Sequence, residues 1–302
     1  MSFRIEPGEA FTLAFRNAAA SQLQHAITTL EERPDGSHEA VHAFRKNLKR
    51  VRSLYRLVAR AAPDFRKREN ERLRDAAKEL SAIRDATALI GTAKYLRDNA
   101  RGPEEAEALG RIVAALKTRR DWLAEAESGL DQKLLHTADI LREAIAALDD
   151  VSFDDSHHKV ARMLAKSWRK TMRRAQAAIG DCHGEASAEA FHELRKRTQD
   201  YRQYQALLHH AWPSAMKAKR TAGKQLADLL GHVHDLDVLS GLVEAEPQLF
   251  SRNDDLAHLL DAIIARQQET RRQALLQAEA VFADDPEAES ERIELLWVLV
   301  GN

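Results

Sequence analysis

The sequence predicts an all-α protein, and its composition and patterning support that class. Among 302 residues, 44% are apolar, so a substantial core can form, while only 12 glycines and 7 prolines interrupt the chain. Alanine, leucine, glutamate, arginine and lysine dominate, and these residues favour helices. No convincing run of alternating β-branched residues indicates a strand. The length suffices for two domains of ordinary size.

Turn-forming residues divide the chain into eight long predicted helices, four in each half, and a short C-terminal extension. Proline and glycine mark most of the breaks, because neither continues a helix easily. An acidic stretch lies near the middle, so we predict two units, 1–150 and 151–302. The breaks lie near residues 33–36, 62–63, 102–103, 149–155, 180–184, 212–213, 246–254 and 284–286.

The helix expected between residues 37 and 61 carries a cationic face. No acidic residue lies between Glu39 and Asp64, whereas seven arginines or lysines do. At about 100° per residue, the basic side chains share one face, while Phe44, Val51 and Tyr55 share the opposite face. The residues of the basic face are His42, Arg45, Lys46, Lys49, Arg50, Arg52 and Arg56.

Nearly the same pattern returns 150 residues later, at His192, Arg195, Lys196 and Arg202. The same offset relates the prolines at 63 and 213 and the segments 80–85 and 230–235. A register kept through two helices and a turn indicates a duplicated structural unit. Four helices in each unit suggest a four-helix bundle.

A third basic helix precedes the second copy. Its cations are Arg162, Lys166, Arg169 and Arg173, and apolar residues such as Trp168 occupy its other side. If neighbouring helices pack antiparallel, this stripe and the second copy line one groove.

Such stripes are usually solvated helix faces, but those faces normally mix charges of both signs. Here like charges stand four residues apart, as in Arg45–Lys49, and each such pair opposes helix formation by roughly 0.2–0.5 kcal/mol. A bound polyanion would explain the repulsion. We expect His42 and His192 to donate hydrogen bonds to it. Asp85 and Asp235 are expected to pair with His or Arg behind the site, with ordinary helix ion pairs as the alternative.

With these residues the chain resembles the CHAD family, the conserved histidine α-helical domain. A His, an Arg three residues later and a basic cluster match the segment from His42 to Arg56. A later Leu-x-x-x-Arg-Asp element matches 80–85 and, in variant form, 230–235. The departures at Gln199, Asp200 and His234 weaken the second copy.

The resemblance implies two four-helix bundles related by pseudo-twofold symmetry, with a central basic groove that binds inorganic polyphosphate. It also implies a stand-alone binding module, without an enzyme domain or cofactor, that is directed to polyphosphate granules.

Three other functions compete with this interpretation. The string His232, His234, Asp235, Asp237 suggests a metal-dependent phosphohydrolase, but two histidines two residues apart on a helix point about 200° away from each other. We therefore expect no metal site and no catalysis. A nucleic-acid-binding protein is disfavoured by the pI of about 6.9 and net charge of −1. Its basic faces also lack the interleaved aromatic residues that single strands favour.

The third rival is a ligand-free scaffold that contacts partners through the apolar segment 295–300. We expect this segment to dock on the chain's own bundle, with homodimerisation as the alternative.

The single cysteine, Cys182, excludes an intramolecular disulfide. The N-terminus lacks a signal-peptide pattern, and no apolar run approaches a membrane span of about 20 residues. We therefore expect a cytoplasmic protein.

Overall fold

The computed structural model describes residues 3–34, 36–80, 82–126, 129–184 and 186–301, with the side chains of 38, 82–85, 124 and 126 outside the description. The described residues are helical and form no strand, which confirms the all-α prediction. Their α-helices are α1 (Phe11–Glu32), α2 (Ser37–Leu57), α3 (Pro63–Glu79), α4 (Ala82–Asp98), α5 (Pro103–Ala126), α6 (Leu130–Ala146), α7 (His157–Asp181), α8 (Ala188–Leu207), α9 (Pro213–Ala245), α10 (Asn253–Val281) and α11 (Pro286–Val300).

Buried apolar side chains form two cores, and both halves of the chain contribute to each. The larger core joins α1, α2, α3 and α6 to α7, α8, α11 and the adjacent ends of α9 and α10. The smaller core joins α4 and α5 to the remaining parts of α9 and α10. The cores therefore do not follow the division into 1–150 and 151–302, which stays a prediction about the repeat.

The predicted count of four long helices is wrong for the first half, where the described residues form six. In the second half the four helices α7 to α10 and the shorter α11 match the prediction. In the first half the chain changes from one core to the other at helix breaks, between α3 and α4 and between α5 and α6. Gly129 precedes α6 with φ 87°, in the left-handed region that favours glycine. By contrast, α9 and α10 each run through both cores without a break.

The amphipathic pattern of α2 is realised as predicted. Phe44, Val51 and Tyr55 are fully buried, so its cationic face is turned away from the larger core. Burial of each large side chain contributes about 1.5–3 kcal/mol, which exceeds the repulsion between neighbouring like charges on the helix.

The C-terminal extension docks on the chain's own bundle. Ile293 and Trp297 of α11 are buried, and α11 packs along α7. The buried carboxylate of Glu289 accepts hydrogen bonds from Trp168 Nε1 at 3.0 Å and Tyr201 Oη at 2.8 Å, and Lys219 Nζ lies 3.1 Å away. These contacts fix α11 to α7, α8 and α9.

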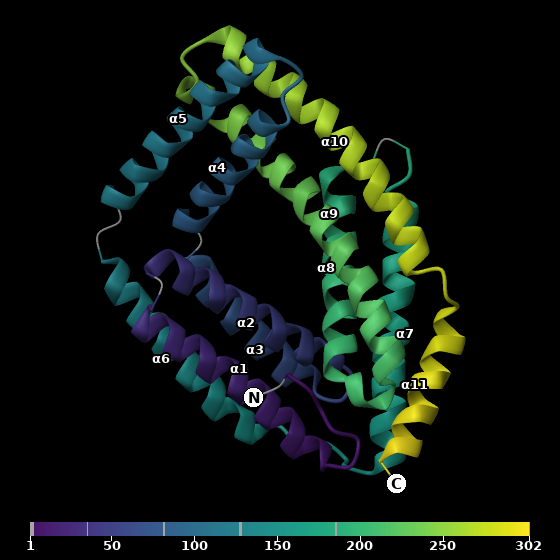
Figure 1. Ribbon diagram of the computed structural model, residues 1–302. Coiled ribbons are helices and arrows are strands. Elements are labelled where there is room, and N and C mark those ends of the chain that lie inside the picture. The colour runs from purple at the N-terminus through teal and green to yellow at the C-terminus, as the bar shows by residue number, and fades with distance from the viewer. Residues whose placement is uncertain (1–2, 35, 81, 127–128, 185, 302) are drawn as a thin grey trace.

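The helices form a ring in which α2 faces α8 and α9 (Figure 1). Both chain ends lie in the lower part of this view, while α4 and α5 meet α9 and α10 at the top. In the part of the chain that is described, no helix combines the length and apolar character needed to cross a bilayer. This arrangement places α2 and α8, the helices that carry the two basic copies, opposite each other.

Candidate functional site

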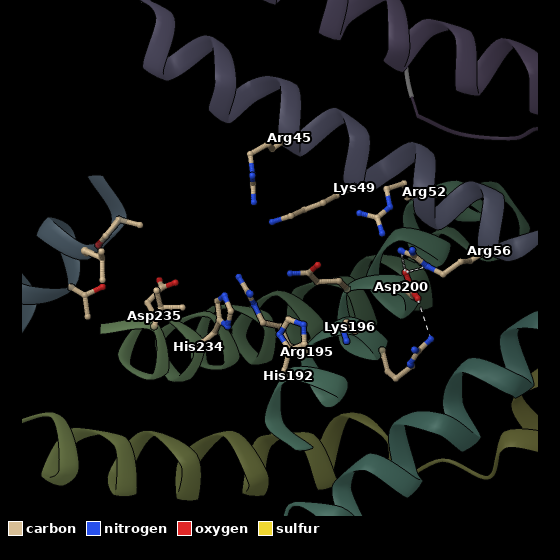
Figure 2. A pocket seen from close by; sticks show the side chains of 16 residues that line it. Arg45, Lys49, Arg52, Arg56, His192, Arg195, Lys196, Asp200, His234 and Asp235 are labelled. Carbon is tan, nitrogen blue, oxygen red and sulfur yellow. Dashed lines mark hydrogen bonds and ion pairs between the residues drawn. The ribbon is translucent and has the colours of Figure 1, made fainter. Parts of the chain in front are cut away.

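A cavity of about 580 Å³ lies between α2, α8, α9 and α4 (Figure 2). Basic side chains enter it from α2 on one side and from α8 on the other. The lining residues are Arg45, Lys49, Arg52, Arg56, Ala88, Leu89, Thr92, His192, Arg195, Lys196, Arg197, Gln199, Asp200, His234, Asp235 and Val238.

Four cations of α2 form one stripe along the cavity wall, at spacings of four, three and four residues. Two of them are held by α3: Arg45 Nη1 donates to the carbonyl oxygen of Ala77 at 3.1 Å, and Arg52 Nε donates to Asn70 Oδ1 at 2.9 Å. Because each bond uses one N–H, the guanidinium groups keep further donors for a ligand.

The innermost cation of this stripe is neutralised by the protein itself. Asp200 of α8 is 1% exposed and accepts hydrogen bonds from Arg56 Nε at 2.9 Å and Ser53 Oγ at 2.8 Å. Arg197 Nη1 lies 3.6 Å from the same carboxylate. Asp200 therefore links α2 to α8 at one end of the cavity. The first copy has Arg50 at the matching position, and the aspartate of the second copy serves as the acceptor for Arg56 and Ser53.

The cavity wall contributed by α8 and α9 contains two histidines in contact. The rings of His192 and His234 lie 5.3 Å apart with an interplanar angle of 31°. Burial, followed by the charges of Arg195 and the neighbouring His192 and Lys49, lowers the pKa of His234 to about 4. Burial and Lys196 also lower the pKa of His192. Both rings are therefore neutral near pH 7 and can each donate one N–H.

The described lining residues include seven lysines or arginines and two aspartates, with neutral histidines. Lys196 and Arg197 also pair with Glu193, which lies outside the lining. Burial and then the neighbouring Arg56 lower the pKa of Arg52 to about 10, although the carboxylate of Asp200 acts in the opposite direction. Partial burial with insufficient countercharge is the environment that an anionic ligand would relieve.

Seven of the predicted binding residues meet in this cavity, namely Arg45, Lys49, Arg52, Arg56, His192, Arg195 and Lys196. Asp235, predicted to lie behind the site, is itself a lining residue. The side chain of Asp85 lies outside the described residues.

Other predicted residues of the two copies lie outside the cavity. His42 and Lys46 are exposed on α2. Arg50 is turned toward α1, where its Nη1 donates to Gln22 Oε1 at 2.9 Å. Burial and the charges of Arg220 and Arg202 lower the pKa of Arg50, so these three arginines form a separate cluster. The face of α2 that lines the cavity is therefore narrower than predicted.

The two copies also present different faces to the cavity. His192 lines it whereas the matching His42 does not, and Arg52 lines it whereas the matching Arg202 does not. Arg202 lies beside Gly223 of α9, where a Cβ would stand 3.7 Å from its Cγ. The lining face of α8 therefore differs from the face expected from the repeat.

The prediction that the basic stripe of α7 lines the same groove is wrong, because Arg162, Lys166, Arg169 and Arg173 lie outside the cavity. The reason is α11, which covers that side of α7 and supplies carboxylates. Arg169 and Arg173 pair with Glu287, and Arg162 lies 3.6 Å from Glu294.

Sequence reasoning missed Arg197 and the roles of Gln199, Asp200 and His234 as lining residues. Arg197 directly follows the Arg195–Lys196 pair, but its wheel position gave no reason to place it on the binding face. The structure explains its orientation, since it is paired with Glu193 and Asp200.

The string suggestive of a metal site is divided among different neighbours. The ring of His232 stacks on Tyr95 of α4 at 5.3 Å, whereas His234 contacts His192. Asp237 is bonded to Arg271 and Gln267 of α10. Within the described ranges, no group of three His, Cys, Asp or Glu side chains could hold a metal ion.

Comparison with known proteins places this arrangement in context. The sequence model of the CHAD domain matches residues 17–244. A crystal structure of the CHAD domain from the plant Ricinus communis is similar over 97% of this chain and 93% of that one, with a TM-score of 0.55 and 19% sequence identity. At that identity the likeness supports the fold. No curated protein matches the sequence.

Proposed function

Because the chain belongs to the CHAD domain family, a family linked to polyphosphate, we propose that its central cavity binds inorganic polyphosphate. The observation that supports the proposal is the concentration of seven lysines and arginines among the described residues that line a space of about 580 Å³. Arginine offers a planar pair of donors to phosphate oxygens, and lysine supplies a mobile point charge. A chain of phosphates satisfies several such groups at once.

The chemistry of the lining favours a polymer without bases. Among the described residues that line the cavity there is no Phe, Tyr or Trp. Single-stranded nucleic acids gain about 1–3 kcal/mol per base from stacking on aromatic side chains. Without aromatic side chains in the described lining, a nucleic acid gains no stacking energy there. A polyphosphate has no bases, so its binding does not depend on stacking.

The proposed role is binding without catalysis, with association to polyphosphate granules as its cellular consequence. In this role the cations neutralise the ligand, and His192 and His234 donate hydrogen bonds to phosphate oxygens. Arg56 holds the cavity in shape through Asp200.

The test is a calorimetric titration with long-chain polyphosphate, with tripolyphosphate and single-stranded DNA as comparison ligands. Polyphosphate should bind more tightly than DNA of equal charge, and its affinity should fall with salt with a log–log slope near −0.7 per phosphate contact, by analogy with single strands. Metal-dependent release of phosphate from the polymer would instead favour a phosphohydrolase. DNA that displaces polyphosphate readily would favour a nucleic-acid-binding protein.

A charge-matched comparison locates the site. The triple variant Arg45→Gln, Lys49→Gln and Arg52→Gln removes three cavity charges. A control with Lys117→Gln, Lys133→Gln and Lys224→Gln removes three exposed charges from α5, α6 and α9, none of which lines the cavity. Only the first variant should lose binding, while both should keep the helical circular-dichroism spectrum.

A further inference from the structure

Positive charge continues beyond the cavity in the direction of the C-terminal end of α2. Arg60 follows Arg56 by four residues, in the turn between α2 and α3. There α7 crosses the end of α2, and Ser167 Oγ donates to the carbonyl oxygen of Leu57 at 2.6 Å. The junction brings Arg60 of this turn close to cations of α7.

A second, smaller hollow of about 220 Å³ lies at this junction. It is lined by Arg60, Ala61, Lys159, Arg162, Met163 and Lys166. Two of its four cations have carboxylate neighbours, since Lys159 pairs with Asp154 at 2.5 Å and Arg162 lies 3.6 Å from Glu294. Arg60 and Lys166 have no ion pair with any described residue.

Cations bridge the distance between this hollow and the cavity. Burial, followed by the charges of Arg174, Arg60, Arg66 and Arg197, lowers the pKa of Lys170 on α7. Arg197 lines the central cavity, and Arg60 lines the second hollow, so Lys170 is near both. The described charges with the largest effect on the pKa of Lys170 are all positive.

Arg66 of α3 is a further bridging group. Its positive charge lowers the pKa of Arg52 in the cavity and the pKa of Lys170 outside it. Its Nε is buried without a hydrogen-bond partner among the described atoms. Arg60, Arg66, Lys166, Lys170 and Arg174, here called the outer row, form no ion pair with a carboxylate of the described chain.

We propose that the outer row binds the segment of a long polyphosphate chain that extends beyond the central cavity. This inference rests on the proposed function of the cavity and extends it: the protein distinguishes long from short chains by a second, external set of contacts. A short chain fills the cavity alone, whereas a longer one also reaches Arg60 and Lys166. The row thus assigns a role to Lys166, which does not line the cavity.

The test compares polymer lengths on one variant. Arg60→Gln, Lys166→Gln and Lys170→Gln together remove three outer-row charges, while the triple variant at Lys117, Lys133 and Lys224 serves as the charge-matched control. For polyphosphate of more than about one hundred phosphates at about 0.1 M salt, the outer-row variant should bind between about tenfold and about 100-fold more weakly than wild type, and its salt slope should fall by about 2, given about 0.7 per contact. Its affinity for tripolyphosphate should stay within about twofold of wild type, as should both affinities of the control.

An equal loss of affinity for the long chain and for tripolyphosphate would overturn the proposal. It would mean that these charges act through a long-range electrostatic field and make no direct contact with the chain. Unchanged affinity for the long chain would overturn the proposal as well. A selective loss of DNA binding in this variant would assign the row to nucleic acid. If wild type bound neither polyphosphate, the function proposed for the cavity would fail too, whereas the other outcomes leave that function intact.

Discussion

Two lysines one turn apart on α2 allow a sharp test of the cavity. Lys49 lines it, whereas Lys46 is exposed on the same helix and does not. A hydrogen bond to a charged group contributes about 1.5–3 kcal/mol. Since about 1.4 kcal/mol corresponds to a factor of ten in affinity, Lys49→Gln should weaken polyphosphate binding by about tenfold to 100-fold.

Calorimetric titration at several salt concentrations measures both affinity and the number of contacts. Lys49→Gln should reduce the log–log salt slope by about 0.7. Lys46→Gln should change the affinity by less than about threefold and the salt slope by less than about 0.3. The melting temperature of both variants should match wild type. Equal losses for the two variants would refute the reasoning, because binding would then follow net charge and not position in the cavity.

Three further predictions concern the groups around the site. Asp200→Ala should lower the free energy of unfolding by about 3 kcal/mol, because it leaves Arg56 without its buried partner, and a denaturant titration measures this. Polyphosphate affinity should rise as pH falls from about 7 to 5, because a bound polyanion favours protonation of His192 and His234, whose pKa values are lowered in the free protein. Glu289→Ala should lower the free energy of unfolding by about 3 kcal/mol, because three buried or half-buried donors lose their acceptor, and thermal unfolding measures this.

Each of these has a nearby control. Asp228→Ala removes an exposed carboxylate of α9 and should change stability by less than about 0.5 kcal/mol. His232→Gln should keep the pH dependence that the double variant at His192 and His234 loses, and a flat wild-type profile would contradict that prediction. Glu294→Ala, on the exposed side of α11, should leave the melting temperature unchanged.

The pKa shift also fixes how the free protein responds to acid. The pKa of His234 in the folded state, about 4, lies below its value of about 6.5 in an unfolded chain. Between these values the unfolded chain binds more protons, so the stability of the ligand-free protein decreases as pH falls from about 6.5 to 4. Acid therefore weakens the empty protein while it strengthens ligand binding, and only a bound polyanion offsets the loss.

Helix periodicity was sufficient to predict what faces the core. Phe44, Val51 and Tyr55 are buried because a 3.6-residue period assigns them to one side of α2 regardless of what packs there. The same period does not fix the orientation of a basic face relative to a partner helix. His42 and His192 match in the sequence, yet only His192 lines the cavity, because α2 and α8 present different faces to it.

Other features depend on residues distant in the sequence. The stripe of α7 looks like a ligand face until α11 is placed beside it with Glu287 and Glu294. In the sequence, Asp200 stands where the first copy has the cation Arg50. In the structure its carboxylate accepts a hydrogen bond from Arg56 of α2. Pairing of charges over more than 100 residues is invisible to local pattern, and it decides which cations remain for a ligand.

The distribution of paired and unpaired cations separates two roles for positive charge in this fold. The chain as a whole is nearly neutral, with a net charge of −1, so its acids are numerous enough to pair with its bases. They are used to hold helices together, as Asp200 does between α2 and α8 and Glu287 does between α7 and α11. The described residues of the cavity lining include seven lysines or arginines against two aspartates, and the two cores hold these side chains in place against their mutual repulsion. An anion from outside would relieve the repulsion among these cations, and the proposed polyphosphate ligand is such an anion.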